Sequence, residues 1–180
     1  DTRSSIEWAE DSQTLFYVRL DDNHRPLFVY RHTLGDDAAT DPLIYAEKDI
    51  GYYVGVGKTQ SGAFIQIDVH DHQSNEVYLI DAHKPKSEPR LVTARRHGHE
   101  YGVEHHGDNL IITTNSGDAE DFRIVTAPVA DPSENHWTEY LPHKPGRLLI
   151  EVTAFKNYLV RLEREESLPR IVIRGRGSEE

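Results

Sequence analysis

Short apolar runs separated by polar turns dominate the segment from Tyr52 to Ala94. Within residues 63–69, isoleucine or valine at 65, 67 and 69 alternates with Phe, Gln and Asp. Such an alternation predicts a half-buried strand, and β-branched or aromatic runs between Gly, Asn, Asp and Ser clusters predict antiparallel pairing. No apolar repeat at helical spacing extends over the ten or more residues that a helix needs. The segment therefore predicts four strands, over residues 52–56, 63–69, 76–80 and 90–94.

The same arrangement recurs along the chain. The second strand of each unit starts near Leu15, Phe64, Leu110 and Leu159, at spacings of 49, 46 and 49 residues. The third strand starts near residues 28, 77, 122 and 171, at spacings of 49, 45 and 49 residues. Four strands that repeat every ~40–50 residues predict blades of a β-propeller, which bury their apolar faces only by stacking. The other expected strands are 6–9, 15–19, 27–31 and 43–47, then one starting near Tyr101 with 109–113, 122–125 and 137–141, and finally 148–152, 158–162 and 170–173.

The repeat predicts the fold class and one domain. We expect an all-β chain of about four consecutive four-stranded antiparallel blades, forming a partial propeller over residues 1–180. The last blade lacks its fourth strand, and residues 175–180 form a polar tail. Propellers usually close at about four to eight blades, and no N-terminal strand remains to complete a ring here. An open fan would expose apolar end faces, so we expect the isolated chain to self-associate. The approximate blades are 6–47, 52–94, 101–141 and 148–174. We expect Trp8, Trp137 and the nine tyrosines to pack between blades rather than to form a platform for stacking a ligand.

Composition restricts the partners more than the fold. The chain carries 20 Lys and Arg against 31 Asp and Glu, a net charge of −11. This balance disfavours nucleic acid, which needs a basic stripe, and favours cationic partners through long-range steering that salt weakens. The absence of Cys excludes disulfides and thiol chemistry. No signal peptide and no apolar run near 18 residues is found, so we expect a cytoplasmic location and no membrane partner. We also expect no cofactor.

Four histidines crowd residues 96–106 and raise the question of a metal site. On a strand, His97 and His99 would point to one side, and His105 would share a side with Tyr101. Zinc needs three or four converging nitrogen or oxygen ligands, which this spacing permits but does not require. We favour solvated or hydrogen-bonded histidines over a metal site. His97, His99 and His105 remain the weak metal candidates.

Two charged segments lie where successive blades join. Glu47, Lys48 and Asp49 precede an inner strand, at the point where the chain crosses from the rim to the axis of a propeller. Such connections carry function when a scaffold has any. Arg95, Arg96 and Glu100 offer salt bridges between blades or to another domain, whereas ordinary surface charge is the alternative reading.

Several of these stretches resemble one known family. Arg-His-x-Leu-Gly at residues 31–35, followed by Tyr-x-Glu-Lys-Asp at 45–49, is the most specific match. The chain is similar to the propeller of the prolyl oligopeptidase family, and within it to the oligopeptidase B branch, from about Ile6 to Arg174. The other matching stretches are Trp8 with 15–19, Asp41 with 43–44, Tyr53-Val54 with Lys58-Thr59, Arg95-Arg96 with 99–101, and the strand containing Trp137.

The resemblance implies a gating role. In that family a seven-bladed propeller covers the active site of a C-terminal α/β-hydrolase domain in the same chain and excludes folded proteins. Short basic peptides are then cleaved after Lys or Arg. The present sequence contains no Gly-x-Ser-x-Gly nucleophile motif, and Gly177-Ser178 lies in a charged tail with no strand before it. No catalytic residue or triad is therefore carried over, and we expect this fragment to be inactive alone.

Two other functions remain open. The chain could be a stand-alone propeller scaffold that binds a protein partner, or a propeller enzyme with paired carboxylates at its axis. A parent gene that continues into a Gly-x-Ser-x-Gly segment would favour the oligopeptidase. A gene that ends after closing blades would favour the scaffold, and hydrolysis by this fragment alone would favour the third reading.

Overall fold

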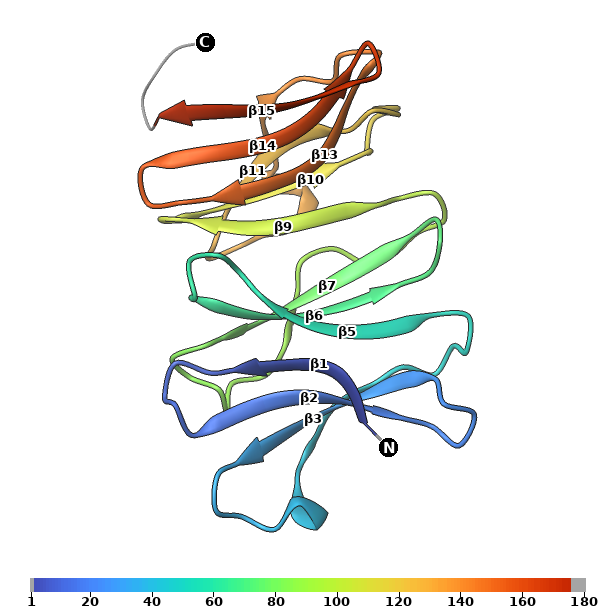
Figure 1. Cartoon of the computed structure of the whole chain (residues 1–180), viewed down its shortest axis with the longest axis vertical. Helices are drawn as coiled ribbons and strands as arrows, with labels where there is room; N and C mark the ends of the chain where they lie inside the picture. Colours follow the sequence, from blue (N-terminus) through green and yellow to red (C-terminus); the bar gives the residue numbers. More distant parts are fainter. Residues whose placement is uncertain (1, 176–180) are drawn as a thin grey trace. The chain divides into compact units, whose positions relative to one another are not determined.

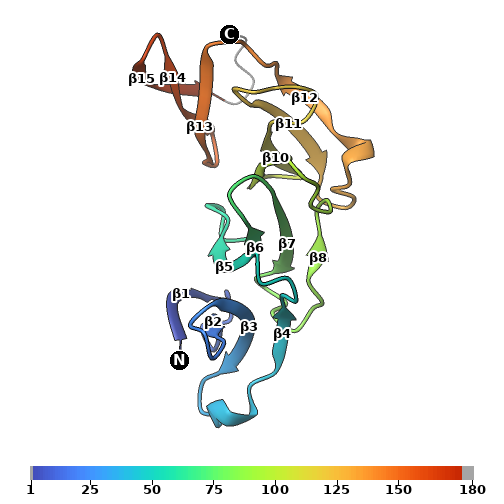
Figure 2. The same cartoon turned by 90° about the vertical axis from the view of Figure 1, so that its right-hand side faces the viewer.

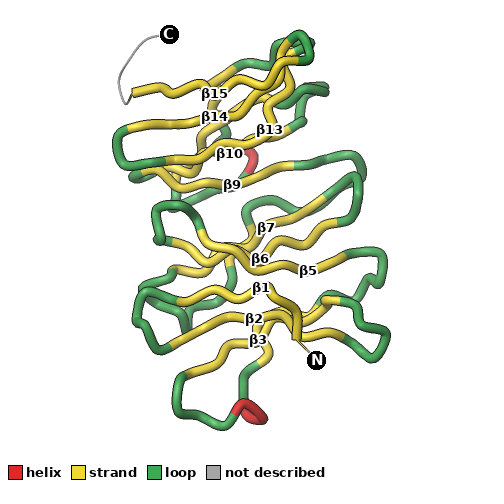
Figure 3. Tube along the Cα trace, viewed as in Figure 1, coloured by secondary structure: helices red, strands yellow, loops and turns green. Residues whose placement is uncertain are grey.

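The computed structural model describes residues 2–175, and its regular secondary structure is almost entirely β-strand. The helical residues it describes are two short 3-10 turns, η1 (Ala38–Thr40) and η2 (Glu134–His136) (Figure 3). No helix within the described range has the length and apolar character needed to cross a membrane. The all-β prediction is therefore confirmed.

Consecutive strands form separate antiparallel sheets, each a simple meander (Figure 1). Three sheets have four strands, whereas the last has three among the described residues, as the sequence pattern indicated. The expected open series of propeller blades is thus confirmed. The first sheet comprises β1 (Thr2–Trp8), β2 (Thr14–Leu20), β3 (Pro26–Thr33) and β4 (Leu43–Ala46); the second β5 (Tyr53–Lys58), β6 (Phe64–His70), β7 (Asn75–Asp81) and β8 (Arg90–Leu91); the third β9 (Tyr101–His106), β10 (Asn109–Thr114), β11 (Arg123–Pro128) and β12 (Thr138–Leu141); the fourth β13 (Arg147–Ala154), β14 (Tyr158–Glu165) and β15 (Leu168–Gly175).

The chain divides into two compact units, residues 1–96 and 97–180, and each is described by itself. Unit 1 holds the first two sheets, which pack through the alternating positions that predicted the strands. Ile65, Ile67 and Val69 of β6 are fully buried, and so are Phe16 and Val18 of β2. All five belong to one cluster, so the period-two pattern places one face of each sheet in a shared wedge. In Figure 2, β4 and β8 are the terminal strands on the right of their sheets, and β1 and β5 are the terminal strands on the left.

Unit 2 holds the third and fourth sheets around a second cluster. Its buried members include Ile124 and Leu141 of the third sheet and Leu159 of the fourth. The backbone N–H of Leu149 donates to the carbonyl of Asp121 at 3.0 Å and ties β13 to the turn before β11. Each unit therefore has its own core between two sheets.

Aspartates begin several of the hairpin turns and explain why the turns form where they do. The Asp21 carboxylate accepts the backbone N–H groups of Asn23 and Arg25. Asp71 repeats this arrangement, accepting from Gln73 and Ser74. An Asp side chain that bonds the backbone two residues later closes a turn without help from the rest of the chain.

Two strand predictions differ from the structure for identifiable reasons. The strand expected over 90–94 is only two residues long; after it, the Val92 N–H still donates to the Val77 carbonyl, and the Arg95 N–H donates to the Glu76 carboxylate. Phe122, expected to open a strand, has φ +65 and lies in the turn before β11, with its ring against the unit 2 core. Trp8, expected to pack between blades, is 42% exposed.

Candidate functional site

A buried carboxylate joins the two sheets of unit 1. Glu47 follows β4, and its side chain is 3% exposed. Arg95, which follows β8, binds both oxygens, with Nη1 2.7 Å from Oε2 and Nη2 3.1 Å from Oε1. Oε2 also accepts the Tyr45 hydroxyl at 2.9 Å, and Oε1 accepts the N–H groups of Lys48 and Asp49. Five donors therefore surround one carboxylate, which satisfies a charge that would be costly to bury unpaired.

Arg95 also contacts Tyr52 through its guanidinium and Glu76 through its backbone N–H. Its guanidinium lies 3.8 Å from the centre of the Tyr52 ring, a cation–π contact. Its backbone N–H donates to Glu76 Oε2 at 3.1 Å, while Tyr78 donates its hydroxyl to Glu76 Oε1 at 3.1 Å. The cluster, which we call the Glu47 hub, consists of Tyr45, Glu47, Tyr52, Glu76, Tyr78 and Arg95.

Three groups of the hub have shifted pKa values. Burial alone would raise the pKa of Glu47, but the hydrogen bonds from Arg95, the Asp49 N–H and Tyr45 outweigh burial and lower it to about 2. Burial, followed by the neighbouring carboxylate, raises the pKa of Tyr45. The hydrogen bonds to Glu47 raise the pKa of Arg95. Near neutral pH, Glu47 and Arg95 therefore stay charged and Tyr45 stays neutral, which suits a structural lock between two sheets.

Four of the six charged residues singled out from sequence have exposed side chains. Lys48 and Asp49 contribute their backbone N–H groups to Glu47. Arg96 is exposed at the end of unit 1. Glu100, in unit 2, donates its N–H to the Asn115 side chain at 2.9 Å. Of the six, Glu47 and Arg95 bond each other through their side chains and so tie the two sheets of unit 1.

Sequence reasoning singled out Glu47 and Arg95 but missed Glu76. Glu76 shares a face of β7 with Tyr78 and Ile80, and that face packs toward the first sheet. An acidic residue at an inward position of a strand is the signal that points to a buried partner. The partner itself lies 19 residues away in a loop, beyond the reach of strand periodicity.

The weak metal candidates do not converge. His97 lies in a turn with its side chain exposed, rather than on the expected strand. His99 is buried, its ring stacks on Tyr101 at 5.2 Å, and its Nε2 lies 3.0 Å from the Thr114 hydroxyl. His105 lies on β9. Between residues 2 and 175, no three His, Cys, Asp or Glu side chains gather as metal ligands would.

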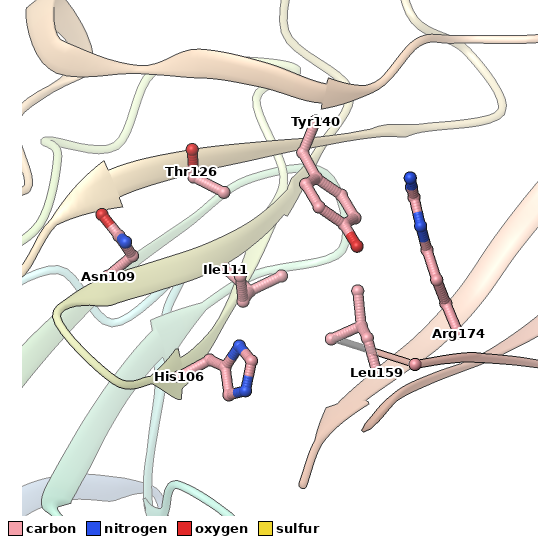
Figure 4. Close-up of a pocket in the computed structure, with 8 residues that line it drawn as sticks. His106, Asn109, Ile111, Thr126, Tyr140, Leu159 and Arg174 are labelled. Carbon is pink, nitrogen blue, oxygen red and sulfur yellow. The ribbon is translucent and has the colours of Figure 1, made fainter. Parts of the chain in front are cut away.

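A cavity of about 270 Å³ opens between the two sheets of unit 2 (Figure 4). Ile111 and Leu159 contribute apolar lining, whereas His106, Asn109 and Thr126 contribute polar groups. The guanidinium of Arg174 lies 5.1 Å from the centre of the Tyr140 ring at the same cavity. Among its lining residues, His106 Nε2 lies 3.3 Å from the Lys156 carbonyl and the Thr126 hydroxyl donates to the Thr138 carbonyl at 3.5 Å.

Comparisons with known proteins agree with this architecture. Residues 1–180 match the family model described as prolyl oligopeptidase, N-terminal beta-propeller domain. The chain is 35% identical over 167 residues to Protease 2 from Moraxella lacunata, and the match covers 93% of the chain and 24% of that relative. It is 32% identical over 176 residues to Dipeptidyl aminopeptidase BI from Pseudoxanthomonas mexicana, covering 97% of the chain and 24% of that protein.

Solved structures show the same arrangement of strands. Oligopeptidase B from Leishmania major superposes with a TM-score of 0.90 at 29% identity, covering 97% of the chain and 24% of that structure. Oligopeptidase B from Trypanosoma brucei, with covalently bound antipain in a closed form, gives a TM-score of 0.91 at 27% identity, covering 99% and 25%. The chain thus spans about a quarter of the length of these relatives. With the family match extending over every residue, the chain belongs to the prolyl oligopeptidase family and is part of its N-terminal β-propeller.

Proposed function

We propose that this chain is the gating and substrate-size-filter segment of a larger serine oligopeptidase. The observation that carries the proposal is the propeller-family match over residues 1–180, together with a coverage of only 24% of Protease 2. A peptidase needs a nucleophile, and the sequence has no Gly-x-Ser-x-Gly motif. The chemistry would therefore come from a C-terminal α/β-hydrolase domain in the remainder of the parent polypeptide.

The packing of unit 1 supports a filter rather than a catalyst. The Glu47 hub fixes the wedge between two sheets through the Glu47–Arg95 pair, in which the pKa of Glu47 is lowered to about 2 and that of Arg95 is raised, so both stay charged near neutral pH. A rigid wall of blades can cover an active site and admit only chains thin enough to pass. Rigid scaffolds commonly place function on the loops they hold.

Cleavage after Lys or Arg is the substrate preference we propose. It is supported by the similarity to Protease 2 and to the two oligopeptidase B structures. The net charge of −11 adds an attraction for basic peptides that salt would weaken. Dipeptidyl aminopeptidase BI is similarly related, so the preference has to be measured. We propose a cytoplasmic location for the parent enzyme.

The test is a comparison of the parent polypeptide with this chain. The parent is expected to hydrolyse short peptides after Lys or Arg, and this chain alone is expected to be inactive. Raising the salt concentration should lower kcat/KM of the parent for a basic peptide. A parent without peptidase activity would refute the proposal. Hydrolysis by this chain alone would support a propeller enzyme instead, and a parent gene that ends after closing blades would support a protein-binding scaffold.

We also propose that the isolated chain self-associates through its outer sheet faces. On the fourth sheet, Ile171, Ile173 and Tyr158 are 70%, 64% and 53% exposed, and on the first sheet Ile6 is 51% exposed. Contiguous apolar surface of this kind favours association in water. Light scattering at increasing concentration is expected to show a rising mass, and a constant monomeric mass would contradict the idea.

A further inference from the structure

The topology of unit 1 gives its two sheets two chemically different edges. In a meander of four antiparallel strands, the chain enters before the first strand and leaves after the fourth at the same ends of the strands, and β1–β4 and β5–β8 are both such meanders. By an edge we mean here the strand ends on one side of unit 1, not an outer strand of a sheet. The edge where one sheet passes to the next carries residues 47–52, which we call the connection edge. The opposite edge carries residues 34–42 between β3 and β4, and we call it the far edge.

The connection edge is also where a linked domain must join. A chain that enters before a first strand, or leaves after a fourth strand, does so at this edge, whatever the number of blades. The relatives are about four times longer than this chain, so most of the parent lies outside it. A domain continuous with complete blades is therefore attached on the side of residues 47–52.

The turn at residues 47–52 is held in one conformation by hydrogen bonds within unit 1. Its first N–H groups are bound by the Glu47 carboxylate, as described above. Asp49 Oδ1 accepts the Gly51 N–H at 2.8 Å, and the Asp49 carbonyl accepts the Tyr52 N–H at 3.1 Å. The Arg25 guanidinium, reaching from the β2–β3 turn, binds the carbonyl of Ile50. The turn therefore satisfies these polar groups internally.

One apolar side chain stands out of this turn. Ile50 is 67% exposed, although its neighbours Lys48 and Asp49 are charged. An isoleucine held on a preorganised turn loses little conformational freedom when it enters an apolar pocket, which favours binding. Leu34 offers a matched contrast, because it is 55% exposed and follows the far end of β3.

We propose that Ile50 is the apolar anchor through which the connection edge docks on the catalytic domain of the parent polypeptide. This inference rests on the proposed function and names the surface that serves it. The Glu47 hub and Arg25 hold the turn, while Ile50 makes the contact. The far edge, with Leu34, faces away from that domain.

The experiment uses the full-length parent carrying Ile50→Asp, with Leu34→Asp as the matched control and Ile50→Val as the conservative variant. Two quantities are measured: kcat/KM for a short basic peptide, and the number of thermal unfolding transitions. Ile50→Asp is expected to lower kcat/KM about tenfold, as removal of a central interface anchor does, and to separate the domains into two transitions. Leu34→Asp and Ile50→Val are expected to stay within about twofold with unchanged unfolding.

The possible results distinguish a failure of the docking inference from a failure of the proposed function. An active parent in which Ile50→Asp behaves like the unchanged protein, or in which Leu34→Asp does equal damage, would overturn the docking proposal. A parent with no peptidase activity would refute the proposed function, and the unfolding transitions would then decide the docking by themselves. Circular dichroism of this 180-residue chain with Ile50→Asp is expected to be unchanged, since the side chain is exposed. If that spectrum changes, Ile50→Ser replaces the variant.

Discussion

The wedge between the first two sheets and the wedge between the last two share a strand pattern but not a chemistry. In unit 1, Ile65 pairs with Ile80 and both are buried. In unit 2, the corresponding pair is Leu159 with Arg174, beside a cavity of about 270 Å³. The repeat therefore fixes the strand register, whereas the side chains at matching positions decide how completely a wedge is filled.

In unit 1, the segment that follows the third strand of the second sheet contributes to the packing of the wedge. In unit 1, this segment folds back over the first sheet, where the Ala82 carbonyl accepts the Glu10 N–H at 2.9 Å. The Pro85 carbonyl accepts Arg31 Nη1 at 2.9 Å, which closes that end of the wedge. Connections, as well as strands, complete the packing of a blade pair.

The largest expected effect on the two wedges comes from removing the Glu47 charge at the centre of the hub in unit 1. Glu47→Ala would leave Arg95 and two N–H groups without their acceptor, which is expected to cost about 4 kcal/mol of the free energy of unfolding. Only unit 1 should be affected. The two tryptophans allow this to be measured, because Trp8 lies in unit 1 and Trp137 in unit 2. Urea unfolding followed by fluorescence in Trp137→Phe and Trp8→Phe backgrounds reports each unit separately.

The control for this prediction is the double variant Glu47→Ala with Arg95→Ala. Its loss should be clearly smaller than the sum of the two single losses, because the uncompensated charge is removed together with its partner. Equal losses in the Trp8 and Trp137 signals would show that the hub does not act locally.

The second test uses pH in place of mutation. The pKa of Glu47 falls from the ordinary 4.5 to about 2 in the folded chain, so its stabilisation is present above pH 4.5 and is lost as the pH falls toward 2. The loss is about 3 kcal/mol for a shift of this size. Glu47→Gln provides the reference, because it keeps the other carboxylates of unit 1 whose pKa values are lowered, those of Glu10, Asp11, Asp21 and Asp71.

The measurement is the difference in unfolding free energy between the unchanged chain and Glu47→Gln, taken between pH 7 and pH 2. That difference should be constant above pH 5 and shrink below it. A difference that is independent of pH would mean that Glu47 is not ionised and paired in the folded state.

The strands were predictable because their signal is local. Alternation along residues such as 64–69 reflects one face in the core and one outside, and the spacing of the units exposed the repeat. Exceptions arise where hydrogen bonds outside the strand pairing take over. After the short β8, the N–H of Arg95 bonds the Glu76 carboxylate, and the N–H of Phe122 donates to the Ala119 carbonyl in a local turn. Neither interaction has a signature in the periodicity.

The site was predictable only in part, for the same reason. Position in a connection marked Glu47 and Arg95, but no spacing rule pairs two residues 48 positions apart. Tyr45, Tyr52 and Tyr78 were expected in the wedge between blades, yet their roles as donor and ring partner emerge only from the packed structure. His97 and His99 do not share the direction expected of a strand, because His97 lies in a turn.

The smallest predicted effect compares the two wedges directly by enlarging matched side chains. Ile65→Phe inserts volume at a position that is 0% exposed in a filled wedge, which is expected to cost about 2 kcal/mol. Leu159→Phe adds the same kind of volume beside the unit 2 cavity, so its cost should be below about 1 kcal/mol. The free energies of unfolding, read from Trp8 for the first variant and from Trp137 for the second, check the order. Equal costs would mean that the unit 2 cavity is not available to the Leu159 side chain, because the difference depends on free volume rather than on strand register.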